Sequence, residues 1–92
     1  MSRDKELSSI RSRIDEIDSQ LLALMNERAR CAQQVAKVKL DAMHSVDEGC
    51  PAYYRPEREA QILRAIRARN TGPLTSDHIS LIFRELMSSC LS

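Results

Sequence analysis

Apolar side chains recur along the first half of the chain at alternating spacings of three and four residues. The series runs through Leu7, Ile10, Ile14, Ile17, Leu21, Leu24, Cys31, Val35 and Val38. This alternation is typical of the seam of a helix that packs against other helices. No Pro or Gly interrupts residues 7–41, so the pattern predicts a single long helix over that range.

The predicted first helix is too long for a compact chain of this size. At 1.5 Å per residue it would extend for roughly 50 Å, whereas a compact domain of this length has a radius of gyration of about 12 Å. Further apolar residues widen its stripe, so that more than one helix must cover it; they are Leu22, Ala23, Met25, Ala32 and Ala36. We therefore expect a second copy of the chain to supply the missing cover.

The second half of the chain predicts a loop and two shorter helices. Turn-forming residues, among them Gly49 and Pro51, mark a loop over 42–55. Pro56 begins a helix that runs to Arg69, where Asn-Thr-Gly-Pro ends it. The residues expected to face inward on this helix are Ala60, Ile62, Leu63 and Ile66.

Thr75 or Ser76 is a suitable cap for a third helix, which we expect over 75–90. Its predicted inward residues are Ile79, Ile82, Phe83, Leu86, Met87 and Cys90. The chain as a whole, residues 1–92, therefore reads as one all-α domain of three helices, one long and two shorter. We expect it to form an intertwined homodimeric helical bundle.

Composition narrows the class of protein further. A single Phe and no Trp leave an aliphatic core, and two Gly and three Pro are few for an all-β fold. A net charge of +1 argues against nucleic acid as a partner, because phosphate contacts favour a clear positive excess. No apolar run is long enough to predict a membrane span.

The three cysteines, Cys31, Cys50 and Cys90, are odd in number and lack the spacing of a metal site. We expect no bound metal and a reducing, cytoplasmic environment. Cys31 and Cys90 fall within apolar helical patterns, where a free cysteine usually serves as a small buried hydrophobe.

Arg28 interrupts the apolar seam of the first helix. A buried cation is costly unless an anion pairs with it, so Arg28 predicts a salt bridge to Glu27 or Glu59, an outward-reaching side chain, or a ligand. Lys39 lies three turns further along, within about 20° of the same helical direction. These two cations could bracket a small anion or lie at a polar edge.

Arg11 is placed differently on the same helix. It precedes Arg28 by seventeen residues, which is roughly 25 Å along the axis and about 100° around it. Within one straight helix it cannot join a pocket around Arg28. From the antiparallel helix of a second copy it could.

Five short segments together resemble a known family. They are I-R-x-R-I-D-x-I-D-x-x-L-L-x-L at 10–24, E-R at 27–28, K-V-K at 37–39, P-E-R-E at 56–59 and L-I-F-R-E-L-M at 81–87. Their order and separation resemble the all-helical (AroQ-class) chorismate mutases. The closest likeness is to the mutase domains at the N-terminus of bifunctional chorismate mutase–prephenate dehydratases. The resemblance covers residues 7–91.

This resemblance implies a homodimer with antiparallel first helices and two shared sites. The implied reaction is the Claisen rearrangement of chorismate to prephenate, a step of aromatic amino acid biosynthesis, without metal or cofactor. By the family pattern, Arg28 and the partner's Arg11 clamp the two substrate carboxylates. Lys39 reaches the ether oxygen, Arg58 lines the pocket and Glu59 accepts a hydrogen bond from the substrate hydroxyl.

The sequence departs from the family pattern at three places. Arg55 stands where some members have an acid, and Cys90 stands where the third helix often has Ser; both are counted among the substrate-binding residues. The Gln or Glu that reaches the ether oxygen in the family would follow two residues after Ser92. If nothing replaces that group, stabilisation of that oxygen rests on Lys39 alone.

Two other interpretations remain open from the sequence. One is a helical dimerisation or regulatory module of the same fold, with weak or no activity. The other is a nucleic-acid-binding helical domain that uses the basic residues of the second helix, Arg64, Arg67 and Arg69. The near-zero net charge and the cation within the apolar seam argue against the second interpretation.

Overall fold

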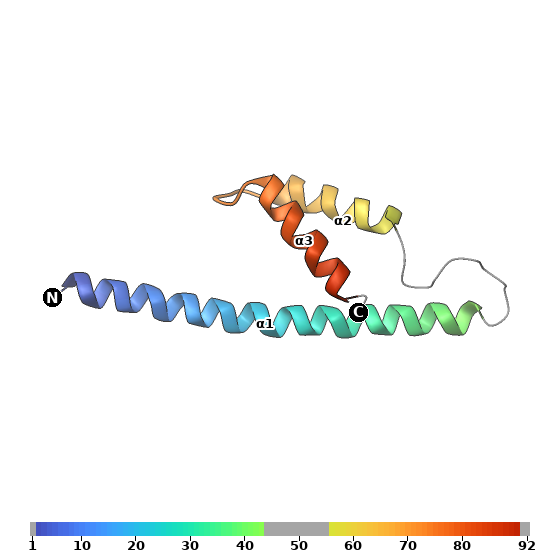
Figure 1. The fold of residues 1–92 in the computed structure, drawn as a ribbon, viewed down its shortest axis with the longest axis horizontal. Helices are drawn as coiled ribbons and strands as arrows, with labels where there is room; N and C mark the ends of the chain where they lie inside the picture. Colours follow the sequence, from blue (N-terminus) through green and yellow to red (C-terminus); the bar gives the residue numbers. More distant parts are fainter. Residues whose placement is uncertain (1, 44–55, 91–92) are drawn as a thin grey trace.

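The computed structural model describes residues 2–43 and 56–90. Over these residues the chain is entirely helical apart from the short turn between its last two helices. The helices are α1 (Ser2–Met43), α2 (Pro56–Arg69) and α3 (Ser76–Cys90). The expected all-α class with one long and two shorter helices is confirmed. Figure 1 shows α1 as a nearly straight rod that extends far beyond the other two helices.

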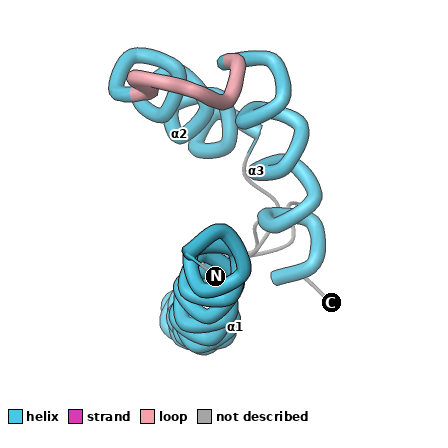
Figure 2. The backbone as a smooth tube through the Cα atoms, turned by 90° about the vertical axis from the view of Figure 1, so that its left-hand side faces the viewer, coloured by secondary structure: helices cyan, strands magenta, loops and turns pink. Residues whose placement is uncertain are grey.

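α3 is the link between the other two helices. It contacts α2 near one of its ends and α1 near the other, whereas no Cα atom of α2 comes within 8 Å of a Cα atom of α1. Figure 2, which looks along α1, shows α2 standing apart from α1 with α3 between them. The position of α2 relative to α1 therefore depends on α3.

The helix ends follow from local sequence chemistry. α1 begins at Ser2, five residues before the predicted start, because no Pro, Gly or other breaker precedes Leu7. α2 begins at Pro56, with acids in its first turn and arginines in its last turn, as the helix dipole favours. α3 is capped by Thr75, whose Oγ1 accepts a hydrogen bond from the backbone N–H of His78 at 3.1 Å.

Asn70 organises the turn between α2 and α3. Its Oδ1 accepts a hydrogen bond from the Gly72 backbone N–H at 3.1 Å, and its Nδ2 donates to the carbonyl of Leu74 at 2.8 Å. Gly72 adopts a φ of 83°, which is accessible to glycine at little cost. The polar side chain of Asn70 thus replaces backbone hydrogen bonds that a helix would otherwise make.

The tightest packing lies along α3. Among the described residues only Met87, Cys90 and Ser80 are buried, and the apolar residues around them on α2 and α3 are half-buried. Two residues expected to face inward do not: Ile82 is 51% exposed and Ala60 is exposed as well. Both positions follow the helical period, but the described part of a single chain leaves them uncovered.

The apolar stripe of α1 is uncovered over its first half. Its members range from 39% exposed at Ile17 to 60% exposed at Leu24; they are Leu7, Ile10, Ile14, Ile17, Leu21 and Leu24. Cys31 is exposed too, so its expected burial is wrong for the single chain, while Cys90 is buried as predicted. Within the described helices, none combines the length and apolar content that a bilayer span requires.

Candidate functional site

Arg28 is the point where α1 meets the end of α3. Its guanidinium Nη1 donates a hydrogen bond to the Sγ atom of Cys90 at 3.3 Å, across 62 residues of sequence. Arg28 is half-buried and Cys90 is buried. The ion pairs between described residues are Arg13–Glu16 and Arg67–Asp77. The alternative of a salt bridge from Arg28 to Glu27 or Glu59 is therefore wrong for this part of the chain.

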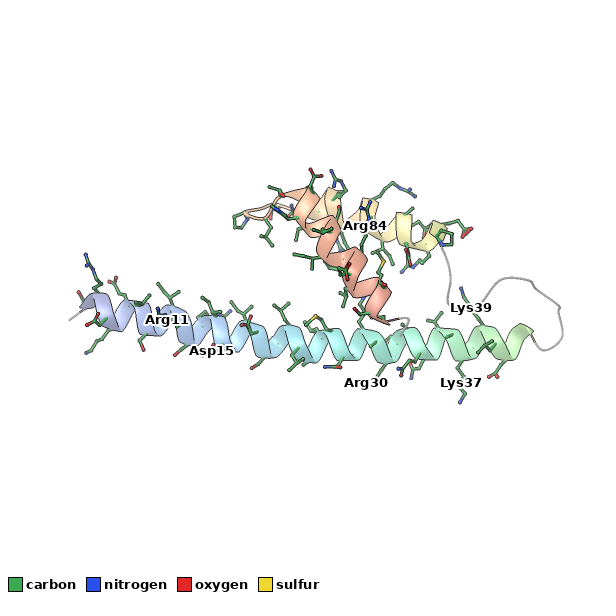
Figure 3. All side chains as sticks on the ribbon, viewed as in Figure 1. Arg11, Asp15, Arg30, Lys37, Lys39 and Arg84 are labelled. Carbon is green, nitrogen blue, oxygen red and sulfur yellow. The ribbon has the colours of Figure 1, made fainter. Side chains whose placement is uncertain are left out.

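Lys39 occupies the same side of α1 as α3. Figure 3 shows its side chain on the side that faces α2 and α3, with Lys37 on the opposite side. Lys39 is half-buried, whereas Lys37 is exposed. It lies about 16 Å along the axis from Arg28 and in nearly the same helical direction. The structure thus presents two partly shielded cations on one face of α1.

Arg58 and Glu59 come from the first turn of α2. Glu59 is half-buried, while Arg58 is exposed and its Nη1 lies 3.5 Å from the Oε1 atom of Gln61 on the same helix. Figure 1 shows α2 on the same side of α1 as α3, above the second half of α1. No hydrogen bond or ion pair between described residues joins Arg58 or Glu59 to Arg28 or Lys39.

Arg11 is not brought to the other candidates within one chain. It is exposed and lies on the opposite half of α1 from Lys39 (Figure 3). The straight course of α1 preserves the separation from Arg28 of roughly 25 Å that the sequence predicts. Arg55, also counted as a substrate-binding residue, lies outside the described residues.

The donor set favours an organic anion. Guanidinium groups present planar forks that match carboxylates, and an ammonium group supplies a compact positive charge. A carboxylate such as that of Glu59 can accept a hydrogen bond from a hydroxyl group. Among the described residues, no group of three or more His, Cys, Asp or Glu side chains is placed to hold a metal ion. The candidates are suited to a small polyanion that also carries a hydroxyl.

A polar junction between α2 and α3 was missed from the sequence. Arg67, which the sequence placed only among the basic residues of the second helix, donates from Nη1 to the Oγ atom of Ser80 at 3.0 Å and to the Oδ1 atom of Asp77 at 3.1 Å. Ser80 is only 6% exposed. It lies seven residues before the buried Met87, so the helical period could have marked it as an inward position.

Comparison with known proteins agrees with the helical architecture. The chorismate mutase type II family matches this chain over residues 10–92. A chorismate mutase structure from Thermus thermophilus superposes with a TM-score of 0.81 at 26% identity, over 92% of this chain and 98% of that chain. A second form of that enzyme gives the same TM-score at 27% identity, over 94% of this chain and 90% of the other.

Curated relatives are similar over nearly the whole chain. The bifunctional chorismate mutase/prephenate dehydratase of Pseudomonas aeruginosa is 47% identical over 92 residues, and that of Neisseria gonorrhoeae is 42% identical over 89 residues. The chain covers 25% and 22% of these two relatives, about a quarter of their length. The family inferred from the sequence motifs is confirmed: the chain belongs to the chorismate mutase type II family.

Proposed function

We propose that this chain is a chorismate mutase, which catalyses the Claisen rearrangement of chorismate to prephenate. The observation that carries the proposal is the family match over residues 10–92, the segment that contains Arg11, Arg28, Lys39 and Arg58–Glu59. The half-buried cations Arg28 and Lys39, on the face of α1 toward α2 and α3, support it. The product leads to phenylalanine and tyrosine, and we place the reaction in the cytoplasm.

The active form is a homodimer with two shared sites. The exposed stripe of α1 supports this, because a contiguous uncovered apolar surface on a helix marks an interaction site. An antiparallel second α1 covers the stripe and brings the partner's Arg11 to the half of α1 that carries Arg28 and Lys39. Each site then draws on both chains.

The substrate is a dianion, and two guanidinium groups hold its carboxylates. Arg28 binds one carboxylate and the partner's Arg11 binds the other, which fixes the reactive conformer before any bond changes. Holding the two reacting ends of one molecule close together lowers the entropic part of the barrier. Cys90 takes part by accepting a hydrogen bond from Arg28 beside the substrate.

Lys39 stabilises the charge that grows during the reaction. In the transition state the ether C–O bond breaks as the new C–C bond forms, and negative charge builds on the ether oxygen. A fixed ammonium aimed at that oxygen is worth more in the transition state than in the ground state. Arg58 and Arg55 line the pocket, and Glu59 accepts a hydrogen bond from the substrate hydroxyl. No covalent intermediate, metal or cofactor enters this mechanism.

The test is a direct assay of the purified chain. Chorismate has an ultraviolet absorbance that is lost on rearrangement, so turnover is followed without a coupling enzyme. We expect saturable loss of chorismate with prephenate as the sole product. A folded dimer that binds chorismate without converting it would instead identify a binding module of the same fold.

A further inference from the structure

The position of α2 relative to α1 is fixed indirectly. α2 carries Arg58 and Glu59, yet none of its Cα atoms lies within 8 Å of a Cα atom of α1, the helix that carries Arg28 and Lys39. Among the three described helices, α3 is the one whose backbone approaches both of the others (Figure 2). Within one chain, the position of the candidate side chains of α2 relative to those of α1 therefore depends on the junction of α2 with α3.

Apolar contacts and polar contacts hold this junction in different ways. The half-buried apolar residues of α2 and α3 attract each other without a preferred direction, because hydrophobic burial is non-directional. Arg67 adds directional contacts, since its Nη1 donates to Ser80 at 3.0 Å and to Asp77 at 3.1 Å. The contact with Asp77 is exposed, whereas the Ser80 hydroxyl is buried. The Arg67–Ser80 hydrogen bond is thus the better shielded constraint on the angle between the helices.

Arg67 lies far enough from Glu59 along α2 that a small change of angle at Arg67 moves Glu59 appreciably. Arg67 lies in the last turn of α2 and Glu59 in its first turn. The offset of eight positions corresponds to about 12 Å of helix, so a rotation of about 5° at the junction moves Glu59 by about 1 Å. A misplacement of 1 Å at a reacting centre can cost about 10²-fold in rate.

We propose that Arg67 is a positioning residue, which sets the angle between α2 and α3 and thereby aims Glu59 and Arg58 at the substrate. This inference rests on the proposed chorismate mutase function. It assigns a role in the reaction to a side chain about 12 Å along the helix from Glu59. Arg67 acts through α2 and does not touch the substrate.

The first experiment compares Arg67→Ala with Arg69→Ala. Arg69 lies in the same last turn and is exposed, so its replacement removes the same charge from the same helix end without removing a junction contact. We expect Arg67→Ala to lower kcat/KM by about ten- to a hundredfold, and Arg69→Ala to leave it unchanged. Circular dichroism and sedimentation establish that both variants remain helical dimers. Arg67→Lys, which keeps a donor at shorter reach, should recover part of the loss.

A double-mutant cycle separates positioning from a merely structural role. If Arg67 acts by aiming Glu59, then Arg67→Ala should cost much less in kcat/KM when Glu59 is already Gln. Ser80→Ala removes only the buried acceptor and should reproduce part of the loss in kcat/KM. It therefore provides a second test if Arg67→Ala folds poorly. Equal losses from Arg67→Ala and Arg69→Ala, or additive effects in the cycle, would overturn the positioning role while the parent chain stays active. A parent chain without turnover would overturn the proposed function as well.

Discussion

At the scale of single residues, the pairing of Arg28 with Cys90 explains how a cation is accommodated in an apolar seam. The guanidinium is half-buried and has a weak sulfur acceptor rather than a carboxylate as its neighbour at 3.3 Å. A carboxylate partner would neutralise Arg28 and compete with an anionic ligand. A sulfur acceptor orients the guanidinium and, in the proposed function, leaves its charge available to an anionic substrate.

Replacement of Arg28 by Ala should abolish detectable turnover and leave the helical content nearly unchanged. The charge sits in the seam without an ion pair among the described residues, so its removal relieves a desolvation cost. Arg30→Ala is the matched control, because Arg30 is exposed and lies on the side of α1 away from α3 (Figure 3). Turnover and circular dichroism of both variants decide the matter. Unfolding of Arg28→Ala alone would identify Arg28 as a structural residue.

Replacements at Cys90 should separate the acceptor from the volume of the side chain. Cys90→Ser keeps a hydrogen-bond acceptor for Arg28, so kcat/KM should stay within a few-fold of the parent. Cys90→Ala removes the acceptor, and we expect a loss of about tenfold, which corresponds to about 1.4 kcal/mol of transition-state stabilisation. Steady-state kinetics of the two variants measure the difference. Equal activity of Cys90→Ala and the parent would show that the contact with Arg28 does not matter for catalysis.

At the scale of the elements, periodicity and punctuation were sufficient to predict the three helices. Pro56 and the turn after Arg69 bound α2 at the residues where the structure places its ends. The early start of α1 could not be predicted, because the polar residues before Leu7 carry no apolar period. The role of Arg67 was also missed, since its partners Asp77 and Ser80 lie on another helix and only the turn at Asn70 brings them close.

The cap of α3 offers a test of stability at this scale. Thr75→Ala removes the Oγ1 acceptor of the His78 backbone N–H, and loss of such a cap typically costs about 1 kcal/mol. The midpoint of thermal unfolding should therefore be lower for this variant. The variant and the parent are compared at the same protein concentration, because the unfolding temperature of a dimer depends on concentration. Ser89→Ala, at an exposed position in the last turns of α3, is the control and should not lower the midpoint. An unchanged midpoint for Thr75→Ala would contradict the assigned cap.

At the scale of the whole molecule, the single chain is extended rather than compact. Its radius of gyration is 18.2 Å, against about 12 Å for a compact domain of this length. The length of α1 accounts for the difference, since the longest extent of the chain is 68 Å. The apolar stripe of α1 is uncovered over its first half, because nothing else in the described part of the chain packs there. From helix length alone the sequence predicts a second copy, which would cover this stripe. It could not reveal which positions α3 covers, since that depends on tertiary contacts.

The proposed dimer should not dissociate without unfolding. Each chain buries few of its described residues by itself, so most of the apolar contact that holds α1 must come from the partner. Analytical ultracentrifugation across the micromolar range should show a single dimeric species. Denaturation should show loss of helix and loss of the dimer in one transition. A folded monomer at micromolar concentration would rule out both the proposed architecture and the shared sites.

The shared sites themselves can be tested by complementation between two inactive variants. Arg11→Ala and Lys39→Ala should each be nearly inactive as homodimers. The two residues lie on opposite halves of α1, and in the proposed dimer they meet only across the two chains. In a mixed dimer, one site carries both replacements and the other site carries neither. Refolding equal amounts together makes about half of the dimers mixed, so activity should return to about a quarter of the parent value.

The matched control for complementation combines Arg28→Ala with Lys39→Ala. In the proposed dimer both residues serve a site from the same chain, so every site of their mixed dimer still lacks one of them and no activity should return. Recovery with the first pair and none with the second would locate Arg11 in the partner's site. If subunit exchange is verified and the first pair stays inactive, Arg11 does not contribute to the partner's site. The antiparallel pairing of α1 would then lose its functional basis, because the roughly 25 Å between Arg11 and Arg28 on one straight helix leaves no other route to a common site.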